Sequence, residues 1–417
     1  MVKPAIEAPD RTALRAIDGP PFPTYRRSSE NGIPARRMAR WLAIAAFLAV
    51  VFMQWGAKAV AEGWLRILGG PAFEEAFRQQ APRLLKSPLA ADRSADDGVA
   101  GAAFANAYKA SHDALYLNRA REIADFLITN ASLAGDGIPG WGPKLSIGYG
   151  FCPDADNFKG KDLWETTRAL NAILKANEIT PSRAYVETAR KAVENWPSEE
   201  RRLANDGPYA SRGMRFYRKE PESCARKYVK NTNLAMGEVL YRLARQTGEK
   251  RYEQRGEAVL NAELWEILTR KNFGYHGAMI YVDPQEPQNQ KVLKAERNKV
   301  QIDVDGRIVC RNEPPDASCW NHLAFEAYEL YQVQLLSGRD LAEPIGQIMS
   351  IYRTSSLGDT LRFPWQGGDS PTHITAYNCH LRNSGKAVYR DECLRALQHN
   401  PKSSMIFYSL LPDDLVR

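Results

Sequence analysis

Apolar residues recur at helical spacing in three stretches of the chain, each of which opens with polar or aromatic residues. The stretches cover residues 162–178, 231–248 and 319–338. In the third, Leu323, Ala327 and Leu330 follow one another at intervals of three or four residues, which places them on one face of a helix. A short turn and a second, more charged helix come after each stretch. The pattern therefore predicts a helical hairpin that is repeated along the chain.

The order of short turns and long loops predicts how the hairpins are arranged. A further pair of helices is expected between residues 99 and 130, a last helix near 386–398, and short strands near 277–282 and 300–309. Short turns follow the first helix of each pair, whereas long loops follow the second. Hairpins stacked side by side would then carry their long loops on one rim, beside the starts of the first helices. We expect one all-α domain over residues 98–417.

The N-terminal part differs from the repeats. Residues 1–40 hold eight basic and four acidic residues and no apolar periodicity, so we expect a disordered arm. Residues 41–57 are almost wholly apolar over 17 positions, which is near the lower limit for a membrane-spanning helix. Five arginines between residues 26 and 40 predict a cytoplasmic N-terminus by the positive-inside rule. Residues 58–97 would then connect an inner-membrane anchor to an extracytoplasmic domain, periplasmic in a Gram-negative cell.

Two other interpretations of the apolar segment compete with an uncleaved anchor. A buried core helix is less favoured, because the basic arm beside it offers nothing to pack against. A secretory signal is a closer competitor, since Ala57-Lys58-Ala59 and Ala59-Val60-Ala61 both fit the small-x-small cleavage pattern. With either an uncleaved anchor or a secretory signal, the domain that follows would be exported.

The number and spacing of the cysteines fit an exported protein. The six are Cys152, Cys224, Cys310, Cys319, Cys379 and Cys393. In an oxidising compartment an even number allows full pairing. Cys310 and Cys319 enclose a turn-rich loop and form the best local pair, which would leave Cys379 with Cys393 and Cys152 with Cys224. Six free buried thiols would be expected only in a cytoplasmic domain, and none of the cysteines has the spacing of a zinc site.

Composition and charge narrow the classes of partner. The net charge of +7 is spread over 417 residues that include 49 acidic ones, and no nucleic-acid-binding motif is present, so we expect no nucleic-acid partner. Hydrophobic residues make up 44% of the chain, which is enough for a substantial core. The sequence contains no metal-binding motif, serine-triad motif, dinucleotide fingerprint or phosphate-binding loop, so no cofactor is expected either.

The turns between paired helices resemble those of a known fold family. Residues 244–260 read ARQTGEKRYEQRGEAVL, and residues 116–127 and 335–345 are weaker echoes of that turn. In this respect the chain resembles the (α/α)-toroid proteins, which include hairpin-barrel glycosidases, sugar epimerases and alginate-lyase-like polysaccharide lyases. The resemblance covers about residues 99–398 and implies an incomplete toroid, because only four or five hairpins can be counted. It also implies a substrate cleft at the rim where the inner helices start.

Asn321 and His322, at the start of the third stretch, carry the most specific part of the resemblance. They resemble the Asn-His pair at which alginate-type lyases neutralise a carboxylate and transfer a proton, although the residues that follow, Leu323 to Phe325, depart from that motif. β-Elimination from a uronate needs a neutralised carboxylate, a base for the C5 proton and an acid for the leaving oxygen. The resemblance thus implies His322 as the base and Asn321 as a carboxylate binder.

The other two stretches open with residues of the same kind. Asn231 and Asn233 lie at the start of the second, and Trp164 and Glu165 at the start of the first, and we expect all four to bind substrate. Each also suits a structural role, because Asn and Glu support the starts of helices and a histidine such as His322 is often a packing residue. Their occurrence at one register in three stretches favours a shared site.

Basic and aromatic residues crowd the loop before residue 230. Arg212 and Arg215 are expected to bind carboxylates through their planar guanidinium groups, and Tyr217 to supply the acid. A solvated basic loop explains the same composition equally well. Trp141 and Trp365 lie in loops rich in glycine and proline, where a large ring often covers a sugar.

Two classes of function remain open, because the sequence does not disclose a specific reaction. The first is a membrane-anchored, extracytoplasmic lyase or glycosidase that acts on an acidic polysaccharide. Hydrolysis would need two carboxylates, which Asp154 or Asp156 with Glu165, or Asp369, could supply. The second is a non-catalytic sugar-binding or scaffold subunit of an envelope polysaccharide assembly.

Overall fold

The chain divides into two units, Met1–Gly56 and Ala57–Arg417, and all residues described below belong to the second. The computed structural model describes residues 81–83, 85–90, 94–131, 137–142, 162–196, 198–202, 212–216, 229–269, 271–273, 300–302, 304–310 and 317–354. The predicted arm, the apolar segment 41–57 and the predicted helix near 386–398 lie outside these residues. Within them, no helix is both long and apolar enough to cross a membrane.

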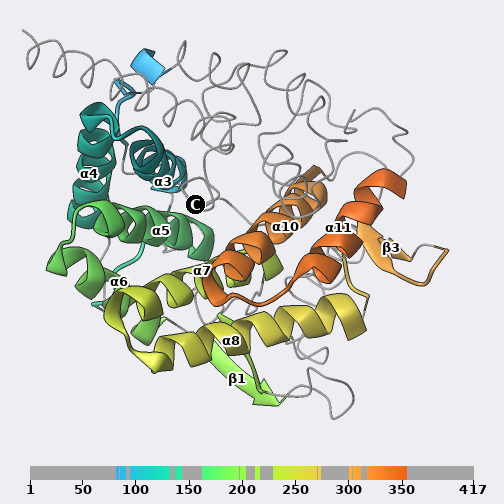
Figure 1. Cartoon of the computed structure of the whole chain (residues 1–417). Coiled ribbons are helices and arrows are strands. Elements are labelled where there is room, and N and C mark those ends of the chain that lie inside the picture. Colours follow the sequence, from blue (N-terminus) through green and yellow to red (C-terminus); the bar gives the residue numbers. More distant parts are fainter. Residues whose placement is uncertain are drawn as a thin grey trace, which may run out of the picture. The chain divides into compact units, whose positions relative to one another are not determined.

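Helical hairpins make up most of the described structure, as the repeated pattern predicts (Figure 1). The four pairs are α3 (Ser94–Ser111) with α4 (Ala114–Thr129), α5 (Leu163–Ile179) with α6 (Arg183–Asn195), α7 (Lys230–Thr247) with α8 (Lys250–Leu264), and α10 (Ala317–Ser337) with α11 (Ala342–Thr354). A short π-helix, η2 (Trp265–Thr269), continues α8. Helix α3 begins four residues before the predicted domain boundary at residue 98.

Side-chain caps and left-handed turn residues fix where the helices begin and end. Asp162 accepts a hydrogen bond from the backbone N–H of Trp164 (2.8 Å), and Asp113 accepts one from that of Leu115 (2.9 Å). These bonds satisfy donors that have no partner within the first turn of a helix. Gly248 ends α7 with a φ of +73°, a conformation that costs glycine nothing. The short turns of the predicted hairpins therefore have local causes in the sequence.

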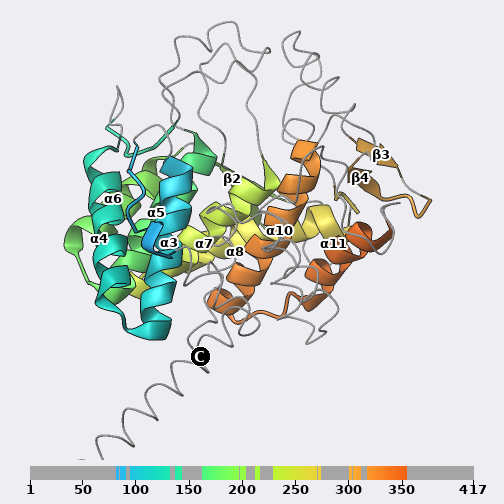
Figure 2. The same cartoon turned by 90° about the horizontal axis from the view of Figure 1, so that it is seen from above.

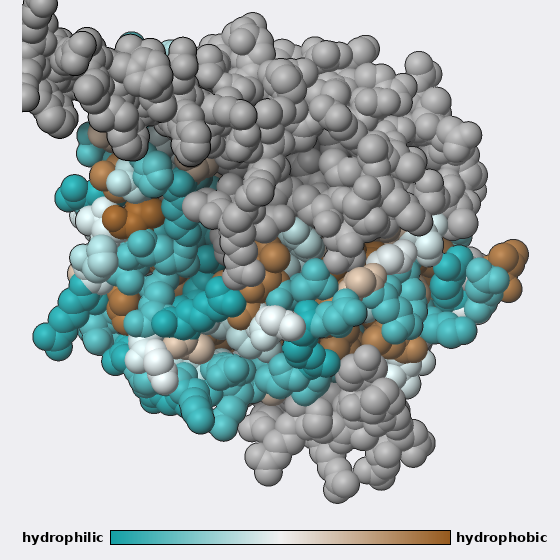
Figure 3. All heavy atoms as spheres, viewed as in Figure 1, coloured by the Kyte–Doolittle hydropathy of each residue, from teal (hydrophilic) through white to brown (hydrophobic). Residues whose placement is uncertain are grey.

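The first helices of the pairs form an inner row in the order α3, α5, α7, α10, and each second helix packs on its own partner. Figure 1 shows α4, α6 and α8 on the outer side of this row, and Figure 2 shows the same order from above. Helix α4 also contacts α5, and α6 contacts α7. In the view of Figure 3 the outer surface of these hairpins is mainly hydrophilic. This side-by-side arrangement was predicted from the alternation of short turns and long loops.

Small residues allow α3 and α5 to approach closely. A Cβ atom on Gly98 would lie 2.6 Å from the backbone carbonyl carbon of Arg168, and one on Gly101 would lie 3.2 Å from the Cβ atom of Ala172, and both neighbours belong to α5. Ala103, Ala105 and the side chains around them are fully buried. Close packing of this kind leaves no room for larger residues.

Two small antiparallel sheets accompany the helices of this mostly helical domain. β1 (Ser198–Arg202) pairs with β2 (Arg212–Phe216), and β3 (Val300–Ile302) pairs with β4 (Ile308–Cys310). The second sheet falls in the range predicted for short strands, whereas the first was missed because its residues, mostly charged, show no apolar alternation. The other predicted strand, at 277–282, lies outside the described residues.

One of the six cysteines has a described side chain. Cys310 is buried at the end of β4 and is disulfide-bonded. The side chains of the other five cysteines lie outside the described part, so the pairing of Cys310 with Cys319 stays a prediction.

Candidate functional site

The starts of the inner helices α7 and α10 meet through a histidine and an asparagine. His322, in the second turn of α10, lies with its Nδ1 atom 2.7 Å from the Oδ1 atom of Asn231, in the first turn of α7. Asn231 is only 1% exposed, and His322 is half-buried. Two residues predicted for the site, separated by 91 positions in the sequence, are thus in direct contact.

Aromatic rings join the start of α5 to the same region. The ring centroids of Trp164 and Phe325 are 4.5 Å apart, with an interplanar angle of 67°, so the rings meet edge to face. Phe325 follows His322 by one helical turn. The guanidinium carbon of Arg168 lies 4.2 Å from the centroid of the Trp164 ring, and the same guanidinium donates a hydrogen bond to the carboxyl of Glu329 in α10. The starts of α5, α7 and α10 therefore converge.

A buried ion pair fixes the relative position of α7 and α10 beside the histidine. The Nζ atom of Lys230 donates to Oε1 of Glu326 (3.0 Å) and to the backbone oxygen of Asn272 (2.7 Å). Both charged side chains are nearly inaccessible. Burial raises the pKa of the Glu326 carboxyl, and Lys230 partly opposes that rise. Removal of either partner would leave an unpaired polar group in the interior.

Glu165, at the start of α5, carries a carboxyl with a raised pKa that contacts α3. Its Oε2 atom accepts a hydrogen bond from the backbone N–H of Ala95 in α3. Burial, with smaller contributions from Asp162, Asp96 and Asp97, raises the pKa of Glu165 to about 7. A carboxyl group of this kind is partly protonated at neutral pH and has the property required of a general acid.

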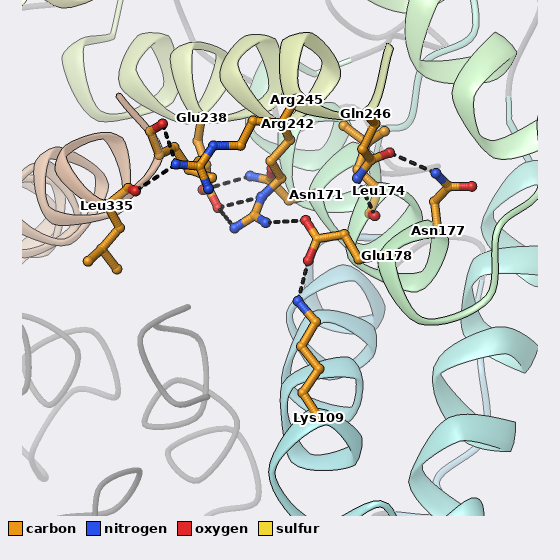
Figure 4. A network of polar contacts seen from close by, with 11 residues as sticks. Lys109, Asn171, Leu174, Asn177, Glu178, Glu238, Arg242, Arg245, Gln246 and Leu335 are labelled. Atoms are coloured by element: carbon orange, nitrogen blue, oxygen red, sulfur yellow. Dashed lines mark hydrogen bonds and ion pairs between the residues drawn. The ribbon is translucent and has the colours of Figure 1, made fainter. Parts of the chain in front are cut away.

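Farther along the inner helices, charged side chains form a network that is buried at Arg242 and Glu238 and partly exposed at Glu178 and Lys109 (Figure 4). The carboxylate of Glu238 accepts hydrogen bonds from Arg242 (Nη2, 2.7 Å) and from Asn171 (Nδ2, 2.9 Å). Arg242 also pairs with Glu178 (2.8 Å), which in turn pairs with Lys109. The network therefore ties α3, α5 and α7 together from the middle of α5 and α7 to their C-terminal ends.

Two buried carboxyl groups meet inside this network. The Glu329 carboxyl accepts a hydrogen bond from Arg168, and the nearby charge of Glu238 repels its ionised form. Ionisation of one buried carboxyl group therefore disfavours ionisation of the other. Burial raises the pKa of Glu329 to about 8 in spite of the nearby arginine, and Glu238 raises it further. The Glu329 carboxyl is therefore expected to be protonated at neutral pH.

The structure brings some of the residues predicted for the site together and separates others. It brings His322 into contact with Asn231 and brings Trp164 to the same helix starts, whereas Glu165 faces α3. The amide of Asn233 points elsewhere: its Nδ2 atom donates to Glu263 of α8 (3.0 Å) within the fully buried interior. Their roles toward a substrate stay predictions.

Other predicted site residues lie partly or wholly outside the described structure. Arg212 and Arg215 belong to β2 and Asn321 to α10, but their side chains are not described. Tyr217, Trp365, Asp154, Asp156 and Asp369 lie outside the described residues. Among those that are described, no group of His, Cys, Asp and Glu side chains is arranged to hold a metal ion.

One aromatic prediction is wrong, and several charged residues were missed. Trp141 is 2% exposed and donates through its indole N–H to the backbone oxygen of Leu127 (2.9 Å), so it fills the core instead of covering a ligand. Arg168, Glu238 and Glu329 had no place in the predicted site. Their only signal in the sequence is that they interrupt apolar stripes that otherwise belong to a buried helix face.

Comparison with known proteins gives structural similarity alone. No protein-family model and no curated protein sequence matches the chain. Among solved structures, the chain is similar to a polysaccharide lyase with a TM-score of 0.45 and 11% identity, over 87% of this chain and 96% of the other. It is also similar to a GH76 α-mannanase of Bacteroides thetaiotaomicron with the same TM-score and identity, over 76% of this chain and 84% of the other.

Proposed function

We propose that this chain is a polysaccharide-processing protein whose reaction takes place where the inner helices α5, α7 and α10 begin. The observation that carries the proposal is the contact between His322 and Asn231 next to the ring pair of Trp164 and Phe325. Imidazole is the commonest general base of enzymes. Aromatic rings offer the apolar surface on which sugar rings stack.

Elimination from an acidic glycan is the reaction that these residues support best. His322 would take the C5 proton of a uronate, the C4–O bond would break as a C4–C5 double bond forms, and the leaving oxygen would receive a proton from an acid. Tyr217 is our candidate for that acid, and Asn321, Arg212 and Arg215 for the groups that bind the carboxylate. These assignments rest on the sequence pattern.

Hydrolysis is a second candidate, and one observation favours it. Glu165 has a pKa of about 7, so it can hold the proton that a glycosidase transfers to the leaving group. The second carboxylate would come from Asp154, Asp156 or Asp369. Glu165→Gln separates the two reactions, because it should abolish hydrolysis of a glycan and leave elimination nearly unchanged.

The location of the protein is part of the same proposal. A domain held outside the inner membrane by residues 41–57, with a cytoplasmic N-terminus, would meet envelope or external polysaccharides. Protease added to intact spheroplasts should then degrade the domain over residues 98–417, and protection of that domain would contradict the assignment. The non-catalytic alternative, a sugar-binding subunit, predicts glycan binding without any product.

Replacement of His322 by alanine tests the reaction. Uronate polymers are incubated with the protein, and the ultraviolet absorbance of the unsaturated product is followed. Loss of a general base should lower the rate about 100-fold or more. The matched control is His112→Asn, since His112 is an exposed residue with a φ of +55° that asparagine tolerates. Unchanged activity of His322→Ala, with an intact circular-dichroism spectrum, would remove His322 from the mechanism.

A further inference from the structure

The hydrogen bond between α7 and α10 constrains the protonation of His322. Its Nδ1 atom faces the Oδ1 atom of Asn231 at 2.7 Å, which is a hydrogen-bond distance. An amide oxygen has no proton to donate, so the proton of this bond must belong to Nδ1. In a neutral imidazole the lone pair then lies on Nε2.

We propose that Asn231 is a positioning residue that holds His322 as the Nδ1–H tautomer and so makes Nε2 the nitrogen that accepts a proton. Asn231 thereby acts through His322, in place of the direct contact with a substrate carboxylate that the sequence pattern suggested. The inference rests on the proposed function for its catalytic meaning. The tautomer itself can be observed whether or not a substrate is known.

Packing around the pair keeps the two helices from sliding past each other. Lys230 precedes Asn231 and is bonded to Glu326 of α10, which lies one turn after His322. Gly237 lets α7 approach its neighbours closely: a Cβ atom there would lie 3.2 Å from Val259 of α8 and 4.0 Å from Val333 of α10. The register that places Asn231 opposite His322 is therefore set by contacts on both sides of the pair.

The other end of the amide indicates that Asn231 is not present for stability. Its Nδ2 atom is buried and has no hydrogen-bond partner within the part of the chain that the structure describes. A buried donor without a partner costs about 1–3 kcal/mol. An apolar residue would avoid that cost, so the value of the amide lies in what its oxygen does to His322.

Nuclear magnetic resonance of the full-length protein labelled with ¹⁵N-histidine tests the inference directly. Long-range ¹H–¹⁵N correlations distinguish the two neutral tautomers, and the signals of His322 are identified by their loss in His322→Gln. We expect the Nδ1–H pattern for His322. An Nε2–H pattern would mean that the amide is turned to donate from Nδ2, and it would overturn the proposal.

The titration midpoint of His322 in Asn231→Asp gives a second test, because a merely structural role of Asn231 would not change it. A carboxylate at hydrogen-bond distance favours the imidazolium form, so the midpoint of the His322 titration should rise by about one pH unit or more. The signal of the exposed His112 serves as the internal control and should not move. An unchanged His322 midpoint in a folded variant contradicts the proposal, and the wild-type tautomer decides the matter if the variant does not fold.

The outcomes separate this inference from the proposed function. An Nδ1–H tautomer together with no product from any uronate polymer would support the positioning role and refute elimination. An Nε2–H tautomer in a protein that does form unsaturated product would refute the positioning role and support elimination.

Discussion

Glu329→Gln should stabilise the protein at alkaline pH. Glu329 is fully buried between Arg168 and Glu238, and its carboxyl has a pKa of about 8 in the folded chain against an ordinary value of 4.5. In the unfolded chain the same group loses its proton near the ordinary value. Between these two values the folded state binds the extra proton, so the free energy of unfolding falls as the pH rises through this window.

The size of the effect follows from the same two values. Each pKa unit corresponds to about 1.36 kcal/mol, so the gap between 4.5 and about 8 is worth about 5 kcal/mol once both states are ionised. Glutamine keeps an oxygen for Arg168 and N–H donors for Glu238, but it cannot ionise. The variant should therefore match the wild type near pH 4.5 and exceed its stability by several kcal/mol at and above pH 8.

Urea unfolding at both ends of this pH window measures the difference between the two proteins. Contributions from Glu165 and Glu326 are common to both and cancel. Glu253→Gln, an exposed change on α8, is the matched control and should leave the pH dependence unaltered. If wild type and Glu329→Gln show the same change in unfolding free energy from pH 4.5 to pH 8, the pKa of Glu329 is not raised in the folded protein and the explanation is wrong.

Two further predictions concern the packing that holds the helix starts together. Gly98→Ala should lower the unfolding free energy by about 1–3 kcal/mol, because its Cβ atom would meet the backbone of Arg168 at 2.6 Å. The control Gly346→Ala, whose Cβ atom would meet no atom within 4 Å, should be nearly neutral. Equal melting temperatures of the two variants would contradict this explanation. Lys230→Met should destabilise the fold by about 3–5 kcal/mol, since it leaves Glu326 buried without its cation. The double variant Lys230→Met with Glu326→Leu should recover most of that lost stability. A double variant as unstable as the single one would refute that explanation.

The fold was predictable because it depends on local signals. Helical periodicity, the Asp162 cap and the glycine that ends α7 each act within a few residues of the chain, and they define the hairpins. The contact of His322 with Asn231 was predictable to the extent that stacked hairpins bring equivalent helix starts together. The choice of Asn231 instead of Asn233 was not, because the rotation of α7 about its axis depends on contacts with α8 and α10 that no local pattern encodes.

The buried charges were not predictable for a related reason. Glu238 and Glu329 look like solvated residues in the sequence, since an isolated charge in the interior is strongly disfavoured. They are tolerated because each has a hydrogen-bond donor far away in the sequence. Asn171, 67 positions from Glu238, adds to the local partner Arg242, and Arg168 lies 161 positions from Glu329. Pairing at such distances along the chain becomes visible only when the helices are assembled.

The N-terminal and C-terminal halves of the inner helices therefore have different roles. In the N-terminal halves, His322, Trp164 and Glu165 present groups suited to chemistry. In the C-terminal halves, Arg242, Glu178 and Lys109 tie three helices together, and Arg245 donates to the last carbonyl oxygens of α10 at Leu335 and Leu336. A site that depends on the register between α7 and α10 needs such ties, because a hydrogen bond of 2.7 Å is lost when one helix slides by a fraction of a turn. The buried network thus keeps the candidate site in register from the opposite end of the same helices.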